Sequence, residues 1–108
     1  MQKTPLMLTE SASAQSSEAA VISTYNSELI TKVAAFQADN TGSTTWIYDT
    51  QTPFNDAIAD PTAYGASNAT CTNTDGTSCL WWNGSHPGQA IQKLVAEGVV
   101  NALSGTWF

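Results

Sequence analysis

One stretch of the chain combines residue types that can do acid–base chemistry. Residues 81–88 read Trp-Trp-Asn-Gly-Ser-His-Pro-Gly and contain His86, the single histidine among 108 residues. An imidazole takes and returns protons near neutral pH more readily than any other side chain. The proline that follows predicts a helix starting at Pro87, whose positive end favours the neutral, proton-accepting ring. We therefore predict that His86 is a general base.

Other roles for this stretch stay open. A histidine before a proline can also cap a helix or fill a turn. Ser85 is adjacent to it, but lacks the Gly-x-Ser-x-Gly context of an exposed nucleophile. We expect no metal and no cofactor, because one histidine and two cysteines predicted to form a disulfide do not make a set of zinc ligands.

The tandem tryptophans before the histidine point to a second role. Strand-like alternation predicts that one ring of Trp81 and Trp82 faces inward and the other outward. Both are candidates to line an acyl or sugar pocket, and the alternative is one core ring and one partly exposed ring.

Composition restricts the partners. Nine acidic residues oppose three basic ones, and the net charge at pH 7 is -6. We expect neither nucleic acid nor an anionic membrane as partner, because the chain has few cations for phosphate groups. No apolar run approaches the roughly 20 residues of a membrane-spanning helix. The length allows one domain at most.

The two cysteines and the polar composition indicate a secreted, extracellular protein. Cys71 and Cys79 flank a turn-rich segment that can bring them together as a disulfide, with two free thiols as the alternative. Asn68 and Asn83 begin N-glycosylation sequons, and we predict a glycan on Asn68. The first ten residues lack the pattern of a signal peptide, so we expect the natural start to lie upstream of Met1.

Hydrophobic spacing and turn residues predict the elements that position these side chains. We expect a loop over residues 1–15, a helix from about Ser16 to Asp39, a strand over Thr44–Asp49, a helical turn over Pro53–Ala59, a loop over Tyr64–Ser78 and a helix from Pro87 to about Leu103. Ser16 or Ser17 would cap the first helix. A single strand has no pairing partner, so the pattern indicates part of a larger α/β fold.

A family resemblance agrees with this interpretation. Residues 81–96, Trp-Trp-Asn-Gly-Ser-His-Pro-Gly-Gln-Ala-Ile-Gln-Lys-Leu-Val-Ala, resemble the terminal block of the GDSL, or SGNH, hydrolases, especially secreted fungal carbohydrate esterases and acylhydrolases. Further likeness lies in residues 25–29, 46–49 and 60–65, and the whole resemblance spans residues 16–103. It implies that residues 1–108 are a single partial domain, the C-terminal part of a three-layer α/β/α sandwich that is incomplete as an isolated chain.

The resemblance also implies roles for individual residues. The family places a catalytic acid three residues before its histidine, and Asn83 occupies that position here. Its amide can orient the His86 ring but cannot offset a positive charge on it. This leaves a serine–histidine dyad, or an acid supplied from elsewhere. Asp49 is the candidate substitute, and its alternative role is that of a turn former.

The implied function is that of a carboxylic ester hydrolase acting on acetyl or similar acyl esters of carbohydrates. His86 would be the general base and acid. The Gly-Asp-Ser block and the oxyanion-hole residues of the family are not found in residues 1–15, so we expect the isolated chain to be inactive without the missing N-terminal part of the same domain. The alternative is a non-catalytic small secreted protein or binding module that uses its aromatic turn.

Overall fold

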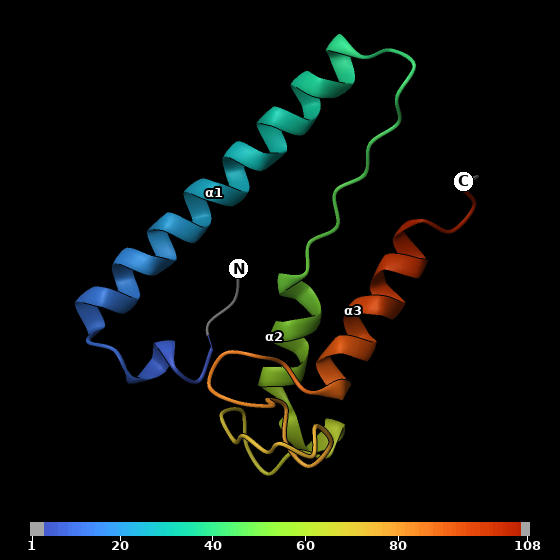
Figure 1. Cartoon of the computed structure of the whole chain (residues 1–108). Helices are drawn as coiled ribbons and strands as arrows, with labels where there is room; N and C mark the ends of the chain where they lie inside the picture. The colour runs from blue at the N-terminus through green and yellow to red at the C-terminus, as the bar shows by residue number, and fades with distance from the viewer. Residues whose placement is uncertain (1–3, 107–108) are drawn as a thin grey trace. The chain divides into compact units, whose positions relative to one another are not determined.

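The computed structural model describes residues 4–106, which are mainly helical (Figure 1). The elements are η1 (Met7–Thr9), α1 (Ala12–Asp39), α2 (Gln51–Ala59), η2 (Pro61–Tyr64) and α3 (Gln89–Ala102). The chain divides into two compact units, of which one is Glu10–Ile47 and the other holds the remaining described residues. None of the described helices is long and apolar enough to cross a membrane.

Helix α1 begins before the predicted start. Its N-cap is Ser11, whose hydroxyl oxygen accepts a hydrogen bond from the Ala14 N–H at 3.2 Å. The prediction of a loop through residue 15 and a cap at Ser16 or Ser17 is therefore wrong, because an earlier serine precedes alanine-rich sequence with high helix propensity. The predicted end at Asp39 is confirmed, and the Asn40 backbone and side chain both donate to the Phe36 carbonyl.

The segment after α1 does not form the predicted strand. The described residues contain helices and isolated bridges only, and Thr44–Asp49 lies outside both. Instead, the Thr45 N–H and hydroxyl both donate to the Gln37 side-chain oxygen, at 2.8 and 3.0 Å. An extended segment needs a neighbouring strand to pair its backbone groups, and none is present between residues 4 and 106. The α/β/α sandwich stays a prediction for a larger protein.

The core lies in the second unit, where α2 and α3 pack side by side (Figure 1). Its buried residues are Ala57, Ala66, Leu80, Trp81 and Ile91. The predicted helical turn over Pro53–Ala59 is confirmed as part of α2. On α3, a Cβ atom at Gly98 would lie 1.7 Å from the Tyr48 hydroxyl oxygen, so this close approach requires glycine.

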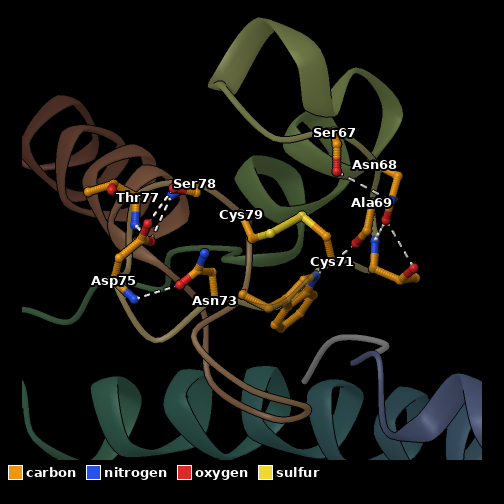
Figure 2. The surroundings of a disulfide bond; sticks show 11 residues. Ser67, Asn68, Ala69, Cys71, Asn73, Asp75, Thr77, Ser78 and Cys79 are labelled. Carbon is orange, nitrogen blue, oxygen red and sulfur yellow. Dashed lines mark hydrogen bonds between the residues drawn. A yellow bond between two sulfur atoms is a disulfide. The ribbon is translucent and has the colours of Figure 1, made fainter.

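The predicted disulfide is confirmed. Cys71 and Cys79 are bonded, with their Cα atoms 5.4 Å apart (Figure 2). Within the closed loop, the Asp75 carboxylate accepts hydrogen bonds from the Ser78 hydroxyl and from the N–H groups of Ser78 and Thr77, the last two at 2.9 and 2.8 Å. These bonds, that of the Ser78 hydroxyl foremost, lower the pKa of Asp75 from 3.8 to about 2. The loop therefore has a defined local structure.

Helix α3 begins at Gln89, after the predicted Pro87. Gly88 is the N-cap, and its N–H donates to the Leu80 carbonyl at 2.7 Å. The Gln89 N–H donates to the Gly76 carbonyl at 2.8 Å. Carbonyl groups in and beside the disulfide loop thus satisfy backbone donors that would otherwise be unpaired at the helix start. A Cβ atom at Gly88 would lie 2.8 Å from the Cys79 carbonyl oxygen, so only glycine allows this approach.

Candidate active site

The candidate base lies on a turn that is closed by backbone hydrogen bonds. The Trp82 N–H donates to the His86 carbonyl at 2.8 Å, and Trp81 and Pro87 form an antiparallel bridge. The tip of the turn is anchored as well, because the Leu6 N–H donates to the Gly84 carbonyl at 2.9 Å. His86 therefore occupies a turn before the helix, and the expected proline at the first helical position is not observed.

The side chain of Asn83 organises this turn. Its oxygen Oδ1 lies 2.9 Å from the Ser85 nitrogen, 3.0 Å from the His86 backbone nitrogen and 2.9 Å from the His86 ring nitrogen Nδ1. Backbone N–H groups only donate, so the atom that they share must be the amide oxygen and not the amide nitrogen. The backbone of the turn thus determines which end of the amide faces the imidazole.

This arrangement selects one tautomer of the neutral ring. An amide oxygen only accepts hydrogen bonds, so Nδ1 of His86 must carry the proton, and Nε2 is left with its lone pair. The His86 side chain is exposed. The ring is therefore oriented by one nitrogen while the other can take a proton from a group outside the turn. The geometry is compatible with a histidine base whose orienting group is neutral.

The disulfide loop is hydrogen-bonded to the segments on either side of the His86 turn. The Asn73 N–H donates to the Trp81 carbonyl at 2.9 Å, and Thr72 and Trp81 form a parallel bridge. Together with the bond from the Gln89 N–H to the Gly76 carbonyl, these contacts join the segment between Cys71 and Cys79 to both sides of the His86 turn. No local pattern in the sequence indicates these links, although Asp75-Gly76-Thr77-Ser78 is a recognisable turn sequence.

The two tryptophans have different environments. Trp81 is 1% exposed, stacks obliquely on Phe54 with ring centroids 5.9 Å apart, and donates its indole N–H to the Ala69 carbonyl at 2.8 Å. Trp82 is 45% exposed, and its ring lies next to Gly76. The predicted inward and outward rings are confirmed, and Trp81 is a core residue. Only Trp82 remains a candidate for substrate contact.

Other predicted site residues have structural roles. The Asp49 carboxylate accepts a hydrogen bond from the Gln51 N–H at 2.9 Å, which fits its alternative role as a turn former before α2. Ser85 contributes its backbone N–H to the Asn83 oxygen. Asn68 is exposed, and its oxygen accepts from the Thr70 N–H and hydroxyl, so its glycosylation stays a prediction. No group of three metal-ligating side chains occurs among residues 4–106.

A hollow between α2 and α3 lies beside the turn. It has a volume of about 340 Å³, and its lining includes Phe54, Pro87, Ile91 and Val95. Pro87 directly follows the candidate base, so this mainly apolar surface is adjacent to the His86 turn.

Comparison with curated proteins shows a similarity over the whole length of this chain. A protein named Acetylesterase from Thermothelomyces thermophilus is 46% identical over 109 aligned positions, which cover 100% of this chain and 36% of that protein. The chain therefore spans little more than a third of the curated relative that it matches. No protein-family model matches the chain, and no solved structure matches it. The similarity indicates a chain related to an ester hydrolase.

Proposed function

We propose that this chain carries the histidine base of a GDSL/SGNH-type carboxylic ester hydrolase, and that the whole protein removes acetyl or other small acyl groups from carbohydrates. The observation that carries the proposal is the 2.9 Å bond between His86 Nδ1 and Asn83 Oδ1, which leaves Nε2 as the proton acceptor. The relative named Acetylesterase supports ester hydrolysis as the reaction class. The resemblance of residues 81–96 supports the finer family.

In the proposed reaction, Nε2 of His86 takes the proton of a serine hydroxyl as that oxygen attacks the ester carbonyl. The imidazolium then returns the proton to the departing alcohol oxygen. In the second half, Nε2 takes a proton from water, which attacks the acyl-enzyme. The serine and the oxyanion-hole donors would come from residues outside this chain, as the resemblance implies.

Asn83 would be a positioning residue in this scheme. When an amide replaces the acid of a serine–histidine–acid triad, presenting the wrong end to the ring imposes the wrong tautomer and lowers kcat by about 10⁴. Here the N–H groups of Ser85 and His86 hold the amide oxygen toward the ring. The tautomer needed by a base would thus be retained, although the imidazolium would lack an adjacent carboxylate.

Secretion is part of the proposal. The Cys71–Cys79 disulfide is compatible with an oxidising, extracellular location, where acylated carbohydrate polymers occur. The remaining part of the same domain would be the chain's principal partner.

The test uses the secreted protein that contains this chain, assayed on p-nitrophenyl acetate and on acetylated xylan oligosaccharides. His86→Ala should lower kcat by about 10⁴-fold or more with the fold intact by circular dichroism. Lys93→Ala is the matched control, because its 3.7 Å ion pair with Glu97 is exposed and Lys93 has no role in this scheme. A His86→Ala protein with undiminished turnover would refute the proposal.

A further inference from the structure

The residue that orients the base is also placed for a chemical change of its own. Asn83 is exposed and is followed by Gly84, which has no side chain to shield its backbone nitrogen. A backbone nitrogen that follows asparagine can attack the side-chain amide carbon and close a five-membered succinimide ring. Asn83 is the one asparagine of the chain that precedes glycine.

We propose that Asn83–Gly84 is a self-modification site at which Asn83 deamidates through a succinimide to aspartate. The Gly84 nitrogen bonds to Cγ of Asn83, the Cγ–Nδ2 bond breaks, and Nδ2 leaves as ammonia with the proton from the Gly84 nitrogen. Water then adds to Cγ, the N–Cγ bond breaks, and the Gly84 N–H is restored. The balance is one water consumed and one ammonia released, with no oxidant or reductant.

The turn favours the first step electronically. Three N–H groups point at the one oxygen Oδ1 of Asn83, from the Ser85 backbone, the His86 backbone and the His86 ring. Donors on a carbonyl oxygen withdraw electron density from its carbon and stabilise the oxyanion that forms when a nucleophile adds. The Asn83 amide therefore has a preformed set of oxyanion donors around it, although its reaction partner is its own backbone.

The turn also favours one product. Water can open the succinimide at the side-chain carbonyl, giving aspartate, or at the main-chain carbonyl, giving isoaspartate, whose backbone is one carbon longer. An aspartate keeps an oxygen at the point where the three donors meet, and charge-assisted bonds are stronger than neutral ones. An isoaspartate displaces this oxygen and breaks the turn closed between Trp82 and His86. The fold thus stabilises the aspartate form.

The consequence for the base rests on the proposed function. The product carboxylate would lie beside Nδ1 of His86 and keep the same tautomer. It would supply the negative charge that the amide lacks and favour the imidazolium formed when the ring takes a proton. Deamidation would convert a base with a neutral partner into a base with an anionic partner.

The test follows the purified protein that contains residues 1–108 over time at neutral pH by peptide mass mapping, with an isoaspartate assay. The chain is made in a host that does not attach N-glycans, because a glycan on Nδ2 of Asn83 would block the reaction. Asn68 and Asn73 are internal controls, since each also accepts backbone hydrogen bonds but precedes alanine or threonine. Asn83 should deamidate about tenfold or more faster than either, a ratio that corresponds to about 1.4 kcal/mol of barrier.

Two variants and unfolding in urea separate the effect of the Asn-Gly sequence from the effect of the folded turn. Gly84→Ala should slow the reaction by shielding the nitrogen, and Asn83→Gln should abolish it because the longer side chain cannot close the five-membered ring. The same chain in urea should give mainly isoaspartate, whereas the folded chain should give mainly aspartate. The proposal would be overturned if Asn83 stayed intact in the folded protein but deamidated in urea. It would also be overturned if the folded protein gave mainly isoaspartate. The mapping needs no ester substrate, so its outcome is independent of whether the protein proves to be an esterase.

Discussion

The unit Glu10–Ile47 and the unit formed by residues 4–9 and 48–106 are stabilised in different ways. The first is a 28-residue helix with no buried residue, and apolar side chains such as Tyr25 and Phe36 are 65% and 51% exposed. The second has shorter helices but buries Leu80, Trp81 and Ile91 almost completely. In the first unit, structure follows from local caps and propensity, whereas in the second it follows from contacts between segments distant in sequence. Perturbations should therefore affect the two units separately.

The largest effect should come from removing the central ring of the second unit. Trp81→Ala deletes the contact with Phe54 and the indole hydrogen bond to Ala69, and it leaves a cavity in the core. We expect a loss of about 3–5 kcal/mol in the free energy of unfolding, measured with urea by near-ultraviolet circular dichroism. The helical signal of α1 should persist. If α1 were lost in the same transition, the two units would be one cooperative structure.

Opening the disulfide should have the next largest effect. The Cys71→Ser, Cys79→Ser pair releases a loop with a sequence separation of 8, which in the chain-entropy model costs about 2–3 kcal/mol of stability. The amide protons of Gly88 and Gln89 should then exchange faster with solvent, because their acceptors lie in or beside this loop. Hydrogen exchange in the double variant measures this, and unchanged protection of both amides would contradict the link between loop and turn.

The first unit should respond to its cap. Ser11→Ala removes the acceptor for the Ala14 N–H and should destabilise the start of α1 by about 1 kcal/mol. Amide exchange at residues 12–15 should increase while the second unit is unaffected. Ser16→Ala is the matched control, because this serine lies inside the helix. Equal responses of the two variants would show that Ser11 is not the cap.

The smallest effect concerns pH. The pKa of Asp75 is about 2 in the folded chain, below its ordinary 3.8, so its stabilising contribution is present above about pH 3.8 and is lost as pH falls toward 2. Asp75→Asn should be less stable than the parent at pH 7, and the difference should shrink between pH 4 and pH 2. Urea unfolding at these pH values measures it. If the difference in free energy of unfolding between variant and parent did not change with pH, the loss would come from the shape of the side chain and not from the charge of Asp75.

The two long helices follow from strong local signals in the sequence. Apolar spacing predicts α1 and α3, and turn residues predict their ends near Asp39 and Ser104. The predicted start of α1 is wrong because several serines close together in the sequence can each accept a hydrogen bond from a backbone N–H. The predicted start of α3 is wrong because the backbone donors at its start bond to the carbonyl groups of Gly76 and Leu80, which no local pattern reveals.

The candidate site was predictable in composition but not in geometry. His86 and Asn83 follow from the motif, and the tandem tryptophans predict one inward and one outward ring. The identity of the buried ring depends on packing against Phe54, and the orientation of the Asn83 amide depends on two backbone N–H groups. The strand over Thr44–Asp49 has suitable residues but no neighbour in the described chain, so propensity alone did not produce it.

The glycine at position 98 affects how freely α3 can move within the second unit. The Tyr48 hydroxyl group occupies the space that a Cβ atom of residue 98 would need, so it restricts the movement of α3. A helix that rotates by one residue, about 100°, or slides by about 1.5 Å would bring a bulkier side chain against this ring. The contact at Gly98 therefore restricts both sliding and rotation of α3. Because His86 lies just before this helix, its position relative to the unit is restricted as well.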